Sequence, residues 1–248
     1  MVIWAVDIMT GGAALLLAVL LGHGQQVLYI SSTMVNRAAD GYRGAGKTDA
    51  KGAAIIADQA RIRRDLVTLR PEGELITELR MLVARRQDLV ADRTRAVNRL
   101  RDQLLAICPA LERALDMTNK GPLVLLTGYQ TPAAIRQAGQ AGLEAWLRRG
   151  ASELAARAFQ AASAQTITVP GELAAALLVA QLATELIRLN ELIDDVDTLI
   201  QDRFHRHDLA EFIISMPGIG VLLGAEFLAA TGGDMSAFAS PDRLAGYA

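Results

Sequence analysis

The sequence predicts an α/β protein in which a large part of the chain is all-α. Near the N-terminus, two short β-prone runs flank an apolar helix-like segment. Farther along, two stretches of more than 30 residues repeat leucine, isoleucine or valine at three- or four-residue steps, the spacing of one helix face. Apolar residues make up 52% of the chain and aromatic residues only 4%, which is typical of helical proteins rich in alanine and leucine.

The first 60 residues alternate between strand and helix signals. The β-prone run at residues 2–6 ends at Asp7, residues 13–21 are predicted to form a buried helix, and residues 26–30 are a second β-prone run. A strand, a helix and a strand in this order predict a β-α-β unit with parallel strands and a covered sheet.

A short helix is predicted at residues 35–39, followed by a glycine-rich loop. The next helix is predicted at residues 50–63, with Thr48 or Asp49 as its N-cap. The segment from Gly41 to Thr48 also matches the P-loop pattern, in which a lysine and backbone N–H groups hold phosphates. Because helix and loop, not a strand, are predicted before it, nucleotide binding through this segment is only a weak alternative.

Two long helices are predicted at residues 73–106 and 172–204, and Pro109 marks the end of the first. Prolines and glycines divide the residues between them into short helices. The long helices predict a coiled coil or part of a bundle.

Arginine is concentrated on the first long helix, although the net charge of the whole chain is -2. Arginine side chains grip phosphates bidentately, and a solvated helix face with internal ion pairs is an equally favoured interpretation. The candidate nucleic-acid-binding side chains on this helix are Arg93, Arg95, Arg99 and Arg101.

A helix at residues 209–214, a turn at residues 216–220 and a helix from residue 221 follow. The turn resembles a helix-hairpin-helix, a nonspecific binder of the DNA backbone. Gly218 and Gly220 would let backbone N–H groups approach a phosphate at the N-terminus of the second helix. A plain turn between two helices is the structural alternative.

Asp7 and Asp49 are the candidate catalytic and metal-binding residues. Asp7 follows a predicted strand, where α/β sheets place their sites, and Asp49 lies at a helix start. Carboxylates that converge there suit Mg²⁺, and paired metals act on phosphodiesters. On spacing alone, the favoured interpretation is a turn residue and an N-cap.

The single cysteine, Cys108, excludes an internal disulfide, is expected to be buried, and fits a reducing cytoplasm. The apolar run at residues 13–21 is too short to cross a bilayer, which takes about 20 residues. A cytoplasmic protein without a membrane segment is therefore expected.

The segment from Lys47 to Ala53, Lys-Thr-Asp-Ala-Lys-Gly-Ala, resembles the Lys-Thr-Asp-Ala-(Lys/Arg)-Asp-Ala signature of the transposases of insertion-sequence family 110, which includes the Piv-type DNA invertases. Residues 4–7 and 24–30 resemble strands of that family. Residues 93–101 resemble its long helix, and residues 216–247 resemble the start of its C-terminal transposase domain. The resemblance keeps the family's order over nearly the whole chain.

The resemblance implies a partial RNase H-like (RuvC-like) domain at residues 1–70, a coiled-coil linker region at residues 71–204, and the start of the C-terminal transposase domain at residues 205–248. In the family, four acids (Asp-Glu-Asp-Asp) bind Mg²⁺ and the C-terminal domain supplies a serine nucleophile. Bacterial family members recombine DNA as oligomers guided by a structured RNA. DNA transposition is thus the implied function, with DNA, guide RNA and further copies as partners and Lys47 near the nucleic acid. A non-catalytic helical module for oligomerisation or nucleic-acid binding is the alternative.

The sequence departs from the family's pattern in four places. Asp7 stands where the family has Glu, and Gly52 stands where the fourth acid is expected, while Asp49 matches the third. The first acidic strand would precede the chain, and the serine segment would follow Tyr247. We therefore expect a truncated transposase derivative with an incomplete active site and impaired catalysis.

Overall fold

The computed structural model describes residues 2–9, 11–42, 48–69, 73–147, 151–238 and 240–245. The chain divides into two compact units, Met1–Gly73 and Glu74–Ala248, called here the N-terminal unit and the helical unit. The N-terminal unit holds a three-stranded sheet, and the described part of the helical unit contains helices and no strand. The predicted class, α/β with a large all-α portion, is therefore confirmed.

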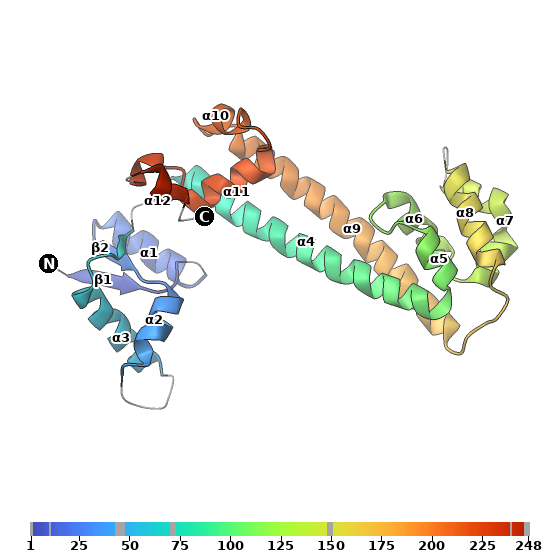
Figure 1. Ribbon diagram of the computed structural model, residues 1–248, viewed down its shortest axis with the longest axis horizontal. Coiled ribbons are helices and arrows are strands. Elements are labelled where there is room, and N and C mark those ends of the chain that lie inside the picture. The colour runs from blue at the N-terminus through green and yellow to red at the C-terminus, as the bar shows by residue number, and fades with distance from the viewer. Residues whose placement is uncertain are drawn as a thin grey trace. The chain divides into compact units, whose positions relative to one another are not determined.

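The sheet of the N-terminal unit is built on the predicted β-α-β unit. Strands β1 (Ile3–Val6) and β2 (Gln26–Tyr29) are parallel, and helix α1 (Ala13–Gly22) connects them. A third strand, β3 (Val67–Thr68), pairs antiparallel with β2 and was not predicted. The strand order β1-β2-β3 leaves β1 at an edge of the sheet (Figure 1).

Helices cover both faces of this sheet (Figure 1). On one face, Leu17 and Leu20 of α1 pack with Val27 of β2. On the other face, the helices α2 (Ser32–Ala39) and α3 (Asp49–Ile62) enclose a second small core around three buried side chains, those of Ile30, Val35 and Ile55. The hydroxyl of Thr48 accepts a hydrogen bond from the Lys51 N–H at 3.2 Å, so Thr48, one of the two predicted candidates, is the N-cap of α3.

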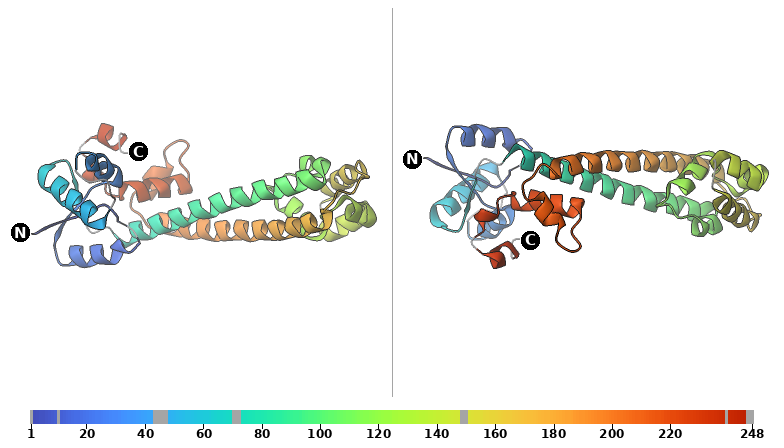
Figure 2. Two further views of the ribbon diagram at one scale, coloured as in Figure 1. Left: turned by 90° about the horizontal axis from the view of Figure 1, so that it is seen from below. Right: turned by 90° about the horizontal axis from the view of Figure 1, so that it is seen from above.

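The helical unit is organised around two long helices, α4 (Glu74–Ile107) and α9 (Glu172–Phe204), which lie side by side along most of their lengths (Figures 1 and 2). Both were predicted within one residue of their observed ends. Their apolar stripes face each other, and fully buried side chains include Leu79, Leu100, Leu104, Leu186 and Ile200. The two helices therefore form a hairpin within one chain.

The segment between the long helices forms short helices, as predicted. Those of its described part lie at one end of the hairpin (Figure 1): α5 (Pro109–Ala114), α6 (Lys120–Gly128), α7 (Pro132–Leu147) and α8 (Ser152–Ser163). Helix α7 is interrupted at Gly139, whose φ of 66° lies in the left-handed region that glycine adopts without strain. Cys108 is fully buried in the shared core, as expected.

The other end of the hairpin carries the last elements, α10 (Ala210–Ile214), α11 (Val221–Thr231), η1 (Met235–Ala237) and α12 (Pro241–Ala245) (Figure 1). Helices α10 and α11 were predicted, and η1 and α12 were not. Gly224 of α11 packs against the ring of Phe204, which would lie 2.8 Å from an added Cβ. Among the described residues, no helix has the length and apolar character needed to cross a membrane.

Candidate metal and nucleic-acid sites

Asp7 lies where β1 ends, half-buried at the side of a hollow of about 550 Å³. The hollow is lined by β1 residues and by one face of α3. The backbone carbonyl of Asp7 accepts a hydrogen bond from the Ser32 hydroxyl at 3.4 Å. Its carboxylate makes no hydrogen bond or ion pair with the residues that the structure describes.

Asp49 begins α3 on the helix face that lines this hollow. Ala53, Ile56, Ala57 and Ala60 line the hollow, and Asp49 lies one turn before Ala53. The Asp49 side chain is exposed and lies outside the lining itself. Because Thr48 caps the helix, the Asp49 carboxylate is not needed as a cap, although a negative charge in the first turn is favourable for the helix dipole.

Gly52 lies in the same first turn of α3, three residues after Asp49. No atom lies within 4 Å of a Cβ added at this position, so a side chain could be accommodated there. Within the described part of the chain, no three His, Cys, Asp or Glu side chains are grouped so that they could hold a metal ion. Asp7 lines the hollow and Asp49 does not, and neither carboxylate has a hydrogen-bond or ion-pair partner among the described residues.

Two of the predicted nucleic-acid-binding arginines join helices within the protein. The Arg93 Nε–H donates to Asn190 Oδ1 of α9 at 2.6 Å, and its Nη2 donates to the Thr118 carbonyl at 3.4 Å. The Arg101 Nε–H donates to Glu112 Oε1 of α5 at 2.7 Å. Only 7% of the Glu112 side chain is exposed, whereas 56% of Arg101 is, so the terminal N–H groups of Arg101 still reach the solvent.

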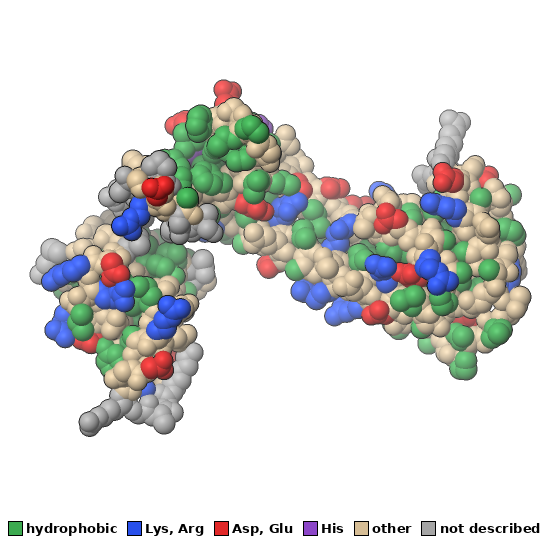
Figure 3. All heavy atoms as spheres, in the orientation of Figure 1, with side chains coloured by type: hydrophobic (Ala, Val, Ile, Leu, Met, Phe, Trp, Pro, Cys, Tyr) green, Lys and Arg blue, Asp and Glu red, His purple; other side chains and the backbone are tan. Residues whose placement is uncertain are grey.

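The other two arginines lie on the surface of α4. Arg95 pairs with Asp92 one turn earlier, and its side chain is 60% exposed. Arg99 is exposed and has no hydrogen-bond or ion-pair partner in the described part of the chain. Figure 3 shows Lys and Arg side chains along the hairpin, with Asp and Glu side chains between them. Arg95 and Arg99 thus lie on a solvated helix face, whereas the contacts of Arg93 and Arg101 with other elements of the protein were not predicted.

Sequence reasoning missed the long-range partners of further α4 residues. The Arg86 Nε–H donates to Asp197 Oδ1 at 2.5 Å, and Arg80 donates to the Ala229 carbonyl at the end of α11 at 2.9 and 3.1 Å. These partners are more than 100 residues away in the chain. For Arg86 the available signal was the opposite charge of the two helices, because α4 is rich in arginine and α9 in acids, whereas nothing in the sequence indicated the carbonyl partner of Arg80.

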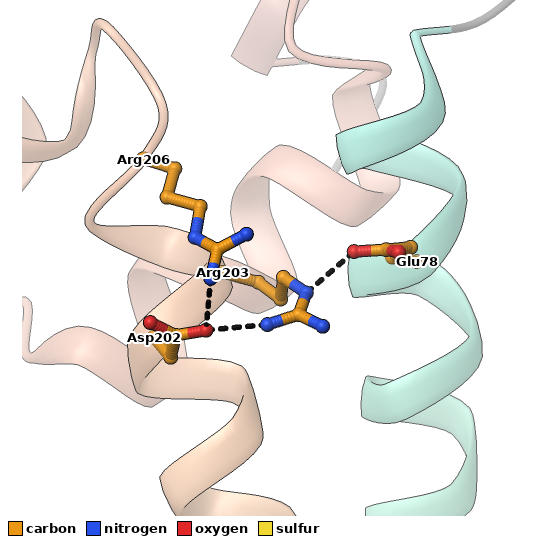
Figure 4. Close-up of polar contacts among 4 residues, drawn as sticks. All are labelled: Glu78, Asp202, Arg203 and Arg206. Carbon is orange, nitrogen blue, oxygen red and sulfur yellow. Dashed lines mark hydrogen bonds and ion pairs between the residues drawn. The ribbon is translucent and has the colours of Figure 1, made fainter.

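Near the other end of α4, Glu78 belongs to a connected group of charges (Figure 4). The Arg203 Nε–H of α9 donates to Glu78 Oε2 at 2.5 Å, and Asp202 contacts both Arg203 and Arg206. The hydrogen bond to Glu78 raises the pKa of the Arg203 guanidinium above its usual range. These contacts fix α9 against α4 near the start of the hairpin.

The turn between α10 and α11 exposes its backbone. Gly218 has a φ of 83°, in the left-handed region, and Gly220 is the N-cap of α11 without a side-chain hydrogen bond to the helix. Both glycines are exposed. The first N–H groups of α11 thus have no side-chain cap, and binding of a phosphate at this turn stays a prediction.

Lys47, the remaining candidate, lies outside the described residues, as do residues 43–46 of the P-loop-like segment. Helix α2 ends at Ala39, just before this segment. A helix rather than a strand thus precedes the glycines, as predicted, and this arrangement differs from that of a P-loop.

Comparison with known proteins points to mobile elements. A family model described as "Transposase" matches residues 1–109, and one described as "Transposase IS116/IS110/IS902 family" matches residues 210–248. The chain is 57% identical over 252 residues to an uncharacterized 42 kDa protein of insertion element IS900 from Mycobacterium paratuberculosis, covering 100% of this chain and 63% of that protein.

Two further relatives come from Streptomyces. An IS116 protein of 44.8 kDa from Streptomyces clavuligerus is 51% identical over 250 residues, which cover 99% of this chain and 62% of the relative. An IS110 protein of 43.6 kDa from Streptomyces coelicolor is 38% identical over 242 residues, covering 95% and 60%. The chain therefore spans about three fifths of the length of these relatives.

Proposed function

Because the chain belongs to the IS116/IS110/IS902 family of transposases, we propose that it binds the DNA of an insertion sequence and takes part in DNA transposition. The observation that carries the proposal is the family match at both ends of the chain, together with high identity to insertion-element proteins along the whole of it. A structured guide RNA and assembly into a homo-oligomer are parts of the same proposal that the family resemblance supports.

The proposed DNA contacts are the solvent-facing arginines of α4 and the turn before α11. Arg95, Arg99 and the outer N–H groups of Arg101 supply positive charge, and the exposed backbone around Gly218 and Gly220 supplies neutral donors. Contacts of both kinds bind the phosphate backbone and do not distinguish one base sequence from another. In this proposal Arg93 acts mainly within the protein, since it already has two partners.

For the N-terminal unit we propose an RNase H-like domain with Asp7 and Asp49 at its metal site. Mg²⁺, the metal implied by the family, takes several oxygen ligands, and two carboxylates are a small share of such a set. The described residues do not fit a complete Mg²⁺ site, because Asp7 and Asp49 have no third ligand and Gly52 supplies none. Impaired DNA cleavage is therefore part of the proposal, and no cleavage step is derived from these two residues.

The DNA-binding proposal is tested by measuring the affinity for a duplex that carries an end of the element at several salt concentrations. Each phosphate contact contributes about -0.9 to the slope of log K against log salt. An Arg95→Ala/Arg99→Ala double variant is expected to bind more weakly and to reduce the magnitude of the slope by about 2. Arg157→Ala, which removes an arginine of α8 with a 53% exposed side chain, is the matched control and should leave the slope unchanged. Equal slopes for all three proteins would refute the proposed role of α4.

A further inference from the structure

A pocket of about 390 Å³ lies where helix α4, helix α5 and the loop that follows α5 meet, and it is called here the α4–α5 pocket. All of its lining residues belong to the stretch 97–118, so it is a local feature of the helical unit. It lies at the end of the hairpin opposite to the one that carries α10–α12 (Figure 1). Pockets for small ligands measure about 300–1,000 Å³, so this one has room for a single ring-shaped group.

Helix α5 contributes to this pocket a carboxylate with one unused oxygen. Only 7% of the Glu112 side chain is exposed, and its Oε1 accepts the hydrogen bond from the Arg101 Nε–H at 2.7 Å. Its Oε2 has no hydrogen-bond partner in the described part of the chain. Because no fully buried side-chain oxygen of a described residue lacks a partner, this Oε2 must reach the pocket that Glu112 lines. A donor group of a ligand would therefore satisfy it.

The α4–α5 pocket also has an apolar floor and a cation at its rim. Leu115 and Met117 line it and are 5% and 3% exposed. Arg113 lines it too, is exposed, and makes no hydrogen bond or ion pair with the residues described. Asp116, the second acid of the lining, already accepts hydrogen bonds from the N–H and the hydroxyl of Thr118. An acceptor, an apolar floor and a cation are thus available to a ligand.

These three features match three parts of one nucleotide. A free phosphate alone is disfavoured, because the Glu112 carboxylate would repel it. A nucleobase has flat apolar faces that suit the floor, and the amino group of cytosine is a donor that Glu and Asp side chains accept. The phosphate of the same nucleotide suits the Arg113 guanidinium. In a duplex this amino group is already bonded to guanine, so only an unpaired cytosine makes all three contacts.

We propose that the α4–α5 pocket binds an unpaired cytosine nucleotide of a single-stranded nucleic acid, with its amino group on Glu112 Oε2 and its phosphate on Arg113. This inference rests on the nucleic-acid binding proposed above and adds a single-stranded ligand to it. Arg101 connects the two, because its Nε–H holds Glu112 while its outer N–H groups are among the proposed DNA contacts. RNA and DNA strands share the base and the phosphate, so the chemistry of the pocket fits both.

The test uses the full chain and fluorescein-labelled strands of about 12 cytosines or thymines, as DNA and as RNA with uracil, and follows binding by fluorescence anisotropy at mildly alkaline pH. The wild type is expected to bind cytosine strands about three- to tenfold more tightly, because thymine and uracil present a carbonyl oxygen where cytosine has its amino group. Glu112→Gln keeps the shape, removes the charge and should lose this preference. Comparison of the DNA and RNA strands shows which of the two the pocket takes.

Arg113→Ala tests the phosphate contact and breaks no bond among the residues described. It should weaken binding of the cytosine strand about tenfold and reduce the magnitude of its salt slope by about 0.7, the share of one phosphate of a single strand. Arg157→Ala, which removes the exposed arginine of α8, is the matched control and should bind like the wild type. This comparison remains decisive even if circular dichroism shows that Glu112→Gln does not fold.

The duplex experiment described above separates this inference from the proposed function. A wild type that binds the duplex but has equal affinity for cytosine and thymine strands would overturn the inference alone. A cytosine preference that persists in a folded Glu112→Gln, or unchanged binding in Arg113→Ala, would have the same consequence. Absence of binding to the duplex and to all single strands would overturn the proposed function as well.

Discussion

At the scale of single residues, Gly52 is the position where the candidate metal site can be changed most directly. It lies three residues after Asp49 in the first turn of α3, with open space where a Cβ would lie. Gly52→Asp adds a carboxylate close to that of Asp49 on the helix surface. Because cation affinity rises with the number of charged ligands, we expect Mg²⁺ to bind about three- to tenfold more tightly, as measured by isothermal titration calorimetry.

Gly52→Asn is the control for this substitution, since it has nearly the same shape without the charge. Both variants replace a helical glycine, so both should stabilise α3 slightly. Mg²⁺ affinity that is equal in the two variants would show that Asp49 and residue 52 do not share a cation.

A second residue-scale prediction concerns Asp58 of α3. A hydrogen bond from the Tyr42 hydroxyl, and then one from Arg61, lower the pKa of the Asp58 carboxyl below its usual value of 3.8. The ionised carboxylate thus stabilises the fold above pH 3.8, and this stabilisation is lost as the pH falls through the lowered pKa. Tyr42→Phe should move the pKa back toward 3.8, which an NMR titration of the Asp58 carboxyl carbon measures.

Tyr29→Phe is the matched control, because the Tyr29 hydroxyl has no hydrogen-bond partner among the residues described. It should leave the titration of Asp58 unchanged. A Tyr42→Phe protein in which Asp58 titrates as in the wild type would mean that the hydroxyl does not bind this carboxylate in solution.

At the scale of secondary-structure elements, the α4–α9 hairpin depends on polar contacts as well as on its apolar seam. Arg86 pairs with Asp197, with 22% and 29% of the two side chains exposed. Arg86→Met keeps much of the side-chain volume and removes the charge, which leaves the carboxylate without its partner. We expect the free energy of unfolding to fall by about 1–2 kcal/mol, as measured by urea denaturation followed by circular dichroism.

The neighbouring Arg85 supplies the control for this prediction. It is exposed and makes no hydrogen bond or ion pair with the described residues, so Arg85→Met should change the free energy of unfolding by less than about 0.5 kcal/mol. If both variants lost a similar free energy of unfolding, the loss would come from removing a positive charge of α4 and not from breaking the Arg86–Asp197 ion pair.

The sequence predicted elements that carry a strong periodic signal. The ends of α9 and the position of β2 follow from apolar spacing and turn residues. Strand β3 has only two residues, too few for an alternating pattern. It is a strand because its backbone pairs with the edge of β2, which the local sequence does not indicate. The partners of Arg86 and Arg93 could not be predicted, since they lie 111 and 97 residues away and depend on how α4 and α9 pack.

At the scale of the whole molecule, the apolar stripe of a long helix does not identify the helix that covers it. The same pattern would suit a second copy of the chain or another helix of this one. In the structure, α4 and α9 cover each other, with polar contacts between them, and the short helices α5–α8 connect their ends. The N-terminal unit has small cores of its own, so the two units are expected to unfold separately.

The chain carries one tryptophan in each unit, which makes separate unfolding measurable. Trp146→Phe leaves Trp4 to report on the N-terminal unit, and Trp4→Phe leaves Trp146 to report on the helical unit. The N-terminal unit is less than half as long and exposes an edge strand, so it should unfold at lower urea concentration. Because the slope m grows with the surface exposed on unfolding, the helical unit should show a slope about twice as large. Coincident transitions with equal slopes would instead require a single cooperative core that joins the two units.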